Sequence, residues 1–361
     1  MAAVNVATIY YGGFAFRGGG VFMHAKLLGA ELQRTGWRVD IVTLESLPSV
    51  LRYLPHLVEK TINLFSPPMG FYYKGRTTRF LYRFFLDRNA DLRIFEDIYL
   101  SWSSPIPSIT LLHAVWSDNL QSISASPKAI ARLVKVEEAA IDAIAHPLAT
   151  VSVAYRDFLV ANLRGSSRLA GVGVVPLGVD LADFQGAIGA DRVAKSMVYC
   201  GSLEARKNVM FLLRVFRQLH DADGDYELTL IGNGPERPEL EHYARAHSLP
   251  VTFRGRLGRN EVIGELRRHS LYVHPSVKES FSFALLEAKL VGLKTIAFEG
   301  LEAPTEFIDV PVASFEENDW LRAIRSAEQV VVKDVDAEAY SSRTMLARTL
   351  GLVSGNERGF R

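Results

Sequence analysis

Apolar residues follow two spacings along the chain, and the spacing predicts which segments are strands and which are helices. Residues 4–11 are rich in β-branched and aromatic side chains, residues 21–32 carry apolar side chains at helical spacing, and residues 37–44 again favour a strand. These segments predict a β-α-β unit at the start of an α/β domain. Further strands of the same sheet are expected at 92–95, 108–115 and 149–155.

The second half of the chain alternates strand and helix patterns more regularly. Strands are predicted at 196–203, 226–232, 251–255, 271–276, 294–300 and 310–315. Helices are predicted at 208–221, 237–248, 260–270, 283–292 and 319–329. Such alternation favours a doubly wound parallel sheet, whose ligands bind beyond the carboxyl ends of the strands.

The length of 361 residues favours two domains rather than one. A Pro-Leu-Gly turn and a Gly/Ala-rich segment separate the two α/β patterns, as is typical of a domain boundary. We therefore expect an N-terminal domain at 1–176 and a C-terminal domain at 177–335. Both are predicted to be Rossmann-like α/β domains that face one another across a cleft.

Composition narrows the function classes. The 41 basic and 40 acidic residues leave almost no net charge, which argues against bulk nucleic-acid binding. The one cysteine, Cys200, allows no internal disulfide and favours a reducing compartment. No stretch reaches the ~18 apolar residues of a spanning helix, and the N-terminus lacks the basic start of a signal peptide. We expect a cytoplasmic protein, with attachment to the inner face of a membrane left open.

The glycine-rich segment at residues 17–24 leads from the first predicted strand into a helix. Gly19 and Gly20 allow a ligand to approach the backbone, where free N–H groups and the helix dipole attract anions. The spacing matches neither the dinucleotide fingerprint nor the Walker motif. A sharp turn without a ligand would explain the same residues.

The loop at residues 201–208 follows another predicted strand. It begins at Gly201 and presents Arg206 and Lys207 just before a helix, which Asn208 is expected to cap. Two fixed cations beside a helix N-terminus suit a diphosphate, and a solvated basic turn is the alternative.

The segment at residues 278–292 places Glu279 and Glu287 on either side of a turn that opens an apolar helix. Ser282 and Phe283 lie at the helix N-terminus, where unpaired N–H groups can meet an anion. Glu279 can accept hydrogen bonds from sugar hydroxyls, and Glu287 lies about one turn into the helix, within reach of a ribose. The pair could equally be the acid and base of a glycosidase, or two solvated acids.

Several motifs together resemble the retaining family-4 glycosyltransferases of the GT-B fold. Glu279 and Glu287 are similar to the E-x7-E element of that family, and residues 201–208 to its G-[RST]-L-x-x-[RK]-K-[GN] phosphate loop. Residues 174–184 resemble its interdomain I-P-N-G-V-D-x-x-x-F, with Leu177 in place of asparagine. The resemblance covers nearly the whole chain and implies two Rossmann-like, doubly wound domains.

The resemblance implies a nucleotide-diphosphate sugar, UDP- or GDP-linked, as the donor on the C-terminal domain, with no metal or other cofactor. Glu279 would bind hydroxyls of the donor sugar, and Glu287 those of the ribose. Arg206, Lys207 and the N–H groups at Ser282 would stabilise the leaving diphosphate, where negative charge grows during transfer.

Other positions follow from the same resemblance. His113, in a segment similar to the one that carries the family's active-site histidine, would lie near the anomeric carbon. Residues 336–361 would form a helix that returns to the N-terminal domain. The remaining donor-binding positions implied are Gly19, Gly20, Gly201, Phe253, Arg254 and Phe283.

Serine replaces the usual family residue at three positions. Ser202 stands where an arginine often contacts phosphate, and Ser280 and Ser282 stand where a Gly-Phe-Gly turn is usual. The favoured function is a retaining transferase that acts on a carbohydrate, lipid-linked or other hydroxyl acceptor in glycan or polysaccharide biosynthesis. A GT-B sugar-nucleotide epimerase and a non-catalytic nucleotide-sugar-binding protein are the alternatives.

The first domain pattern is interrupted from about 46 to 90. Within it, residues 70–88 contain five basic residues, seven aromatic residues and one acid. Such a composition suits an interfacial helix on an anionic membrane. The alternative is an acceptor-side helix whose aromatic side chains pack inward while its arginines stay in water.

Overall fold

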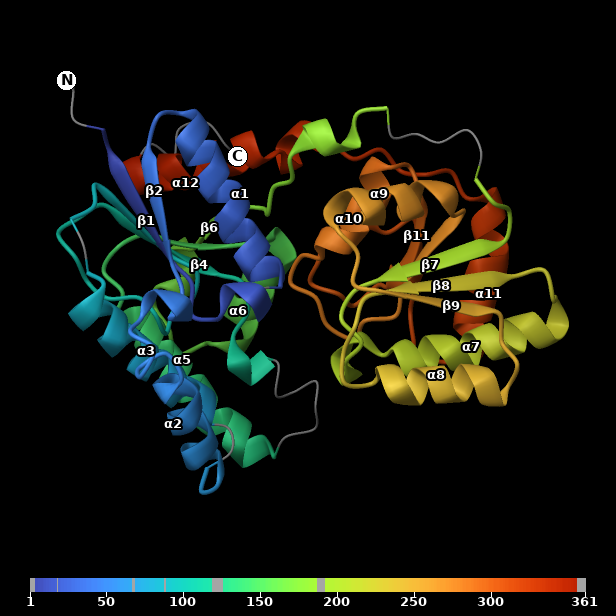
Figure 1. Ribbon diagram of the computed structural model, residues 1–361, viewed down its shortest axis with the longest axis horizontal. Helices are drawn as coiled ribbons and strands as arrows, with labels where there is room; N and C mark the ends of the chain where they lie inside the picture. The colour runs from blue at the N-terminus through green and yellow to red at the C-terminus, as the bar shows by residue number, and fades with distance from the viewer. Residues whose placement is uncertain are drawn as a thin grey trace. The chain divides into compact units, whose positions relative to one another are not determined.

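The computed structural model describes residues 4–17, 19–66, 69–87, 89–118, 126–186 and 192–355. By its internal contacts the chain divides into two compact units. Unit 1 contains Met1–Asp180 and Glu338–Arg361, and unit 2 contains Leu181–Ala337. Each unit is an α/β body built around its own parallel sheet (Figure 1).

The described strands of unit 1 form one six-stranded parallel sheet in the order β2-β1-β3-β4-β5-β6. The strands are β1 (Val6–Tyr10), β2 (Arg38–Val42), β3 (Leu92–Phe95), β4 (Ser108–Leu112), β5 (Leu148–Thr150) and β6 (Gly173–Val174). Four of them confirm the strands predicted up to residue 115. Successive side chains of a strand enter opposite faces, so Ile9 and Tyr10 lie in different core clusters.

The described α-helices of unit 1 are α1 (Gly20–Arg34), α2 (Leu54–Asn63), α3 (Gly70–Phe85), α5 (Pro127–Asp142), α6 (Val153–Asn162) and α12 (Ser342–Ser354). α1 and α12 pack on one face of the sheet, and α3 packs on the other. The last helix is held by a polar contact as well, because Ser342 Oγ donates to Glu31 Oε1 at 2.6 Å. In Figure 1, α12, the last described helix of the chain, lies beside α1.

The strand predicted at 149–155 is only partly right. β5 ends at Thr150, and Ser152 begins α6 because its Oγ accepts from the Tyr155 N–H at 3.0 Å. A serine in extended backbone favours a helix N-cap, and this preference outweighed the β-branched residues around it.

The described strands of unit 2 form a second six-stranded parallel sheet, in the order β12-β11-β10-β7-β8-β9. The strands are β7 (Ser196–Cys200), β8 (Glu227–Ile231), β9 (Val251–Gly255), β10 (Leu271–His274), β11 (Lys294–Phe298) and β12 (Val310–Val312). The α-helices are α7 (Val209–Ala222), α8 (Arg237–Ala246), α9 (Arg259–Arg268), α10 (Phe283–Leu290) and α11 (Glu317–Ser326). All strands and helices predicted for this half are confirmed.

A buried ion pair fixes α10 in unit 2. Lys289 Nζ lies 2.6 Å from Asp309 Oδ1, and both side chains are almost completely removed from water. Asp309 Oδ2 also accepts from the Thr295 N–H at 3.0 Å, which ties the helix to β11. The last turn of α10 is thereby held beside the start of β11.

Two glycines of unit 2 are required by close backbone approach. A Cβ on Gly232 would lie 1.8 Å from the Gly201 carbonyl oxygen, and one on Gly234 would lie 2.1 Å from that of Leu203. The loop after β8 therefore packs directly against the loop after β7 and supports it.

The segment between 46 and 90 contains α2 and α3, which pack against each other. Among the described residues, no helix has both the length and the apolar character needed to cross a membrane.

Candidate active site

In unit 1, one carboxylate is held between two imidazoles at the carboxyl end of the sheet. Glu96 directly follows β3, His113 directly follows β4, and His24 lies on α1. His24 Nδ1 is 2.9 Å from Glu96 Oε2, and His113 Nε2 is 2.6 Å from the same oxygen. Glu96 and His24 are buried, whereas His113 keeps 8% of its surface exposed. His113 is thus the least buried of the three.

Both imidazoles donate to Glu96. Burial raises the pKa of the Glu96 carboxyl, but the charge and hydrogen bonds of His24 and His113 outweigh burial and lower this pKa to about 2. Nδ1 of His24 faces the Glu96 carboxylate, which only accepts, so Nδ1 carries a hydrogen, while Nε2 is buried and has no partner among the described residues. Burial also lowers the pKa of His113, against the hydrogen bond that its Nε2–H donates to the Glu96 carboxylate.

The same three side chains are of the types that bind transition metals. Two ligands of a tetrahedral zinc ion with bonds of ~2.0 Å lie roughly 3.3 Å apart. The contacts of Glu96 at 2.6 and 2.9 Å are shorter than that and have hydrogen-bond lengths. Hydrogen bonding therefore accounts for the cluster as it stands.

The glycine loop before α1 offers backbone rather than side chains. Gly19 is the N-cap of α1 and Gly20 its first residue, and both are exposed. A Cβ on Gly19 would meet no atom within 4 Å. The helix N-terminus is open to a ligand at this point, while Gly18 lies outside the described residues.

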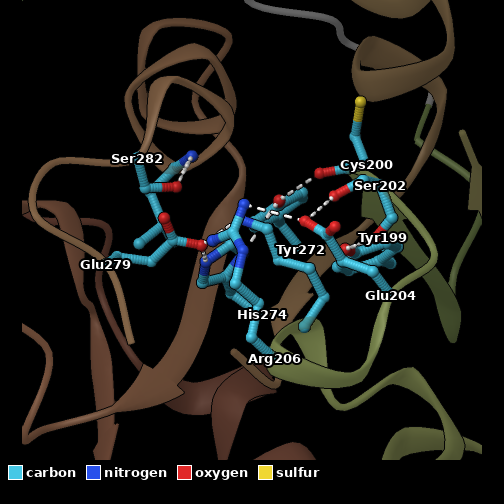
Figure 2. A network of polar contacts seen from close by, with 11 residues as sticks. Tyr199, Cys200, Ser202, Glu204, Arg206, Tyr272, His274, Glu279 and Ser282 are labelled. Atoms are coloured by element: carbon cyan, nitrogen blue, oxygen red, sulfur yellow. Dashed lines mark hydrogen bonds and ion pairs between the residues drawn. The ribbon is translucent and has the colours of Figure 1, made fainter. Parts of the chain in front are cut away.

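In unit 2, Lys207 and Glu279 form an ion pair between the loop after β7 and the loop after β10. Both side chains are largely buried. His274 Nε2 lies 3.0 Å from Glu279 Oε1, and His274 Nδ1 lies 3.1 Å from the Tyr272 hydroxyl (Figure 2). Burial raises the pKa of Glu279, but Lys207 and His274 hold this pKa well below its usual range. Glu279 is an ionised acceptor at neutral pH.

Arg206 lies beside this pair but has its own partner. Its guanidinium is 2.8 Å from Glu204 Oε1, and both side chains are about one-third exposed, at 36% and 37%. An ion pair this exposed is worth little, so an anionic ligand can take the guanidinium at small cost. The Val277 N–H donates to the Arg206 carbonyl at 3.1 Å, which fixes the two loops to each other.

The expected cap by Asn208 is wrong. Asn208 has φ 55° and makes no side-chain hydrogen bond to α7. Its left-handed backbone, which asparagine tolerates better than most residues, serves instead to turn the chain from the basic loop into the helix.

Glu287 is bound by an arginine that the sequence patterns did not single out. Arg259 Nη1 lies 2.9 Å from Glu287 Oε1, and Arg259 Nε lies 2.5 Å from Asp183 Oδ2. Burial raises the pKa of Glu287, against the opposing charge of Arg259. Glu287 is therefore not a helix acid on a solvated face.

Ser282 occupies backbone that L-residues rarely adopt, with φ 72°. Its Oγ accepts from the Leu285 N–H at 3.3 Å and caps α10. Phe283 begins the helix, and the Phe281 ring beside it is buried against Phe307. The turn thus keeps a conformation suited to glycine although serine stands there.

Phe253 and Arg254 lie on the edge strand β9, and no contact joins them to Glu279 or Glu287 among the described residues. Phe253 packs against the core under α8, while Arg254 pairs with Glu265 on α9 at 2.8 Å. The alternation of a strand sends the two side chains to opposite faces. Their expected place beside the base stays a prediction.

Comparison with known protein families matches both units. Residues 18–183 match the family described as Glycosyltransferase Family 4, and residues 194–331 match Glycosyl transferases group 1. The chain belongs to glycosyltransferase family 4. Its E-x7-E element and phosphate loop are the motifs that unit 2 brings together as Glu279 and Lys207.

A GDP-mannose-dependent alpha-(1-6)-phosphatidylinositol dimannoside mannosyltransferase of Mycobacterium tuberculosis is 32% identical over 131 residues. The match covers 34% of this chain and 34% of that relative, so the chain spans about a third of its length. Sucrose-phosphate synthase of Thermosynechococcus elongatus has a similar fold, with a TM-score of 0.68, 19% identity and coverage of 98% and 94% of the two chains. Anabaena HepE, solved with UDP and glucose, also has a similar fold, with a TM-score of 0.64 and 15% sequence identity. The match covers 98% of this chain and 100% of HepE. These likenesses, with the two Rossmann-like sheets, give the GT-B fold.

Sequence patterns did not single out four polar residues that contact the predicted site residues or their partners: His24, Glu96, His274 and Arg259. Glu96 and His274 carried a usable signal, because each lies at the end of a predicted strand, where a parallel sheet binds ligands. His24 carried a signal only as the end of the segment at 17–24 that resembles the first loop and helix of the family, and Arg259 carried none. Their partners Glu96 and Glu287 are 72 and 28 residues distant.

Replacing Glu96 by glutamine should lower the unfolding free energy of unit 1 by roughly 3 kcal/mol at pH 7, because a neutral amide lacks the negative charge that faces both imidazoles. The folded-state pKa of Glu96 is depressed, so its contribution is complete above the ordinary pKa of 4.5 and is lost as the pH falls toward about 2. The difference in unfolding free energy between the wild type and Glu96→Gln should therefore become smaller below pH 4.5. Denaturant titrations followed by tryptophan fluorescence measure it, since Trp37, Trp102 and Trp116 lie in unit 1.

Asp157→Asn is the matched control, because this carboxylate of α6 is 64% exposed. Its effect should stay below about 1 kcal/mol. Equal effects of the two substitutions would contradict the charged role of Glu96.

At Ser282, glycine should be tolerated far better than alanine. Both substitutions remove the cap, but glycine also relieves the positive φ, which costs a non-glycine residue about 1 kcal/mol or more. Ser126 is the matched control, with the same 3.3 Å cap contact and an ordinary φ of −63°. Thermal unfolding of the four variants should give a larger glycine–alanine difference at 282 than at 126, and equal differences would mean that Ser282 is unstrained.

Proposed function

We propose that the chain is a retaining glycosyltransferase, which transfers a sugar from a nucleotide-diphosphate sugar to a hydroxyl acceptor in glycan biosynthesis. The observation that carries the proposal is the Lys207–Glu279 pair at the N-terminus of α10, with Arg206 beside it. This arrangement offers an ionised acceptor for sugar hydroxyls next to cations for a diphosphate. Family membership supports the same chemistry.

During transfer, the bond between the anomeric carbon and the diphosphate oxygen breaks, and the diphosphate gains negative charge. Arg206, Lys207 and the first N–H groups of α10 stabilise that charge, because donors fixed in advance need no reorganisation. Arg206 leaves Glu204 to do so. Retention follows if the acceptor attacks from the face of the leaving group, whose oxygen then takes the acceptor's proton.

The ribose hydroxyls bind Glu287, which Arg259 holds in place. His113 binds the donor sugar near its reacting carbon, and Glu96 fixes its ring through Nε2. Gly19 and Gly20 offer backbone N–H groups at the N-terminus of α1. UDP and GDP both remain donor candidates, since one relative is GDP-mannose-dependent and HepE was solved with UDP.

Lys207→Ala and Glu279→Ala should each reduce acceptor-stimulated release of nucleoside diphosphate at least a hundredfold, because each leaves the other charge unpaired within the site. The assay uses a panel of UDP-, GDP- and ADP-sugars with and without carbohydrate and lipid-linked acceptors. Lys195→Ala is the control, since Lys195 pairs with Asp223 near the start of β7, at the other end of that strand. Near-normal turnover of both site variants would refute the site.

The products separate the alternatives. An epimerised donor would identify a sugar-nucleotide epimerase, and tight donor binding without turnover would identify a non-catalytic binding protein. Neither has an observation in its favour here.

We also propose that α3 attaches the enzyme to an anionic membrane surface, where a lipid-linked acceptor is available. Tyr73, Arg76, Phe80, Arg83 and Phe84 recur at helical spacing and are all exposed, with Phe80 at 66% and Phe84 at 72%. Aromatic side chains thus accompany the arginines on the outer face. The alternative of an acceptor-side helix required aromatic residues packed inward, which only part of the helix provides.

Removing both charges with Arg76→Gln and Arg83→Gln should weaken binding to phosphatidylserine vesicles roughly 30-fold, since each arginine near such a surface contributes about 1 kcal/mol. Replacing Phe80 and Phe84 by serine should weaken it further. Vesicle flotation at low and high salt measures both effects. Arg217→Gln, an exposed arginine of α7, is the control. Salt-insensitive or absent binding of the wild-type protein would remove the membrane proposal.

A further inference from the structure

The two donors that hold Glu279 both contact the same oxygen. Lys207 Nζ and His274 Nε2 each bind Oε1, and in the part of the chain that the structure describes no contact of Glu279 ends on Oε2. The Glu279 side chain retains 10% of its surface exposed. The carboxylate therefore has one oxygen bound to the protein and one available to a ligand.

His274 is itself fixed by the Tyr272 hydroxyl. That hydroxyl lies 3.1 Å from His274 Nδ1 and 3.1 Å from the Cys200 carbonyl oxygen (Figure 2). The ladder between β7 and β10 ends at Val198 and Tyr272, and Pro275 has no N–H with which to extend it. The hydroxyl thus supplies a hydrogen bond where the ladder stops.

Hydrogen-bond directions limit the states of the His274 ring. A carbonyl only accepts, so when the Tyr272 hydrogen points to Cys200, Nδ1 must donate to the hydroxyl oxygen. The ring is then an imidazolium and Nε2–H donates to Glu279. When the hydroxyl hydrogen turns to Nδ1 instead, a neutral ring carries its hydrogen on Nε2. The other neutral tautomer, with its hydrogen on Nδ1, is excluded. It would place the unprotonated Nε2 and the Glu279 Oε1 atom, both acceptors, 3.0 Å apart.

The surroundings act on His274 in opposite directions. Burial lowers the pKa of His274, the Glu279 carboxylate raises it, and the positive charges of Lys207 and Arg206 lower it. The Tyr199 ring stacks on the imidazole with centroids 6.4 Å apart, and adds no charge. Whichever way the ring titrates, both permitted states keep the hydrogen on Nε2.

We propose that His274 is a positioning residue, which turns the Glu279 carboxylate so that Oε1 is held by the protein and Oε2 faces the donor sugar. The proposal rests on the proposed function, because it takes Glu279 as the sugar-binding group. His274 acts through Glu279 and does not touch the ligand. Tyr272 lets the same donation persist in both protonation states of the ring.

Calorimetry with a nucleotide sugar and with its free nucleoside diphosphate tests the proposal. His274→Leu should weaken binding of the nucleotide sugar about tenfold or more, because a hydrogen bond to a charged group is lost, and should leave nucleoside diphosphate binding within about twofold. His274→Gln, whose amide can donate near the position of Nε2, should recover most of the loss. Equal weakening of both ligands, or of neither, would overturn the positioning role.

Side-chain 15N NMR of histidine-labelled protein, assigned by comparison with His274→Gln, reads the ring without any ligand. Nε2 of His274 should stay protonated from about pH 5.5 to pH 8.5. An unprotonated Nε2 within that range would overturn the positioning role alone. Failure of the wild-type protein to bind any nucleotide sugar would instead overturn the proposed function and, with it, the sugar-facing role of Oε2.

Discussion

A carboxylate that leaves water keeps its charge only where fixed donors replace its lost hydration, and both units meet this constraint at the carboxyl end of their sheet. In unit 1, two imidazoles donate to Glu96. In unit 2, a lysine and an imidazole donate to Glu279. Each carboxylate is therefore ionised at neutral pH, although Glu96 is buried and Glu279 keeps only 10% of its side-chain surface exposed. The chemistry proposed for the enzyme depends on these two charges.

The parallel sheets make these clusters possible. Because every strand in such a sheet ends at the same edge, residues from separate parts of the sequence meet there without long side chains. Lys207 and Glu279 are 72 residues apart in sequence, as are His24 and Glu96. The backbone contributes as well, since Gly232 and Gly234 allow the loop after β8 to support the loop that carries Lys207.

Sequence spacing was sufficient for the elements whose pattern decides their structure. The strands and helices of unit 2 could be predicted because each apolar run has the length and period of its element. The segment at 149–155 could not, since a single serine cap decides between strand and helix. Of the candidate site, the residues that belong to sequence motifs could be predicted. Lys207 and Glu279 belong to motifs. His274 could be placed only at a strand end, because the contacts of its ring with Tyr272 and Glu279 form only in the folded structure.

Ser282 illustrates how a site can keep its geometry when its residue type changes. The turn requires a positive φ, which serine adopts only at a cost in free energy, and two features compensate for it. The serine hydroxyl caps α10, as a glycine cannot. Phe281 is buried against Phe307, which anchors the turn from the other side. The backbone N–H groups of the helix N-terminus can therefore keep their direction toward an anion, while the added hydroxyls alter what lies beside it. Under the proposed function, such a change bears on which donor fits rather than on whether a diphosphate binds.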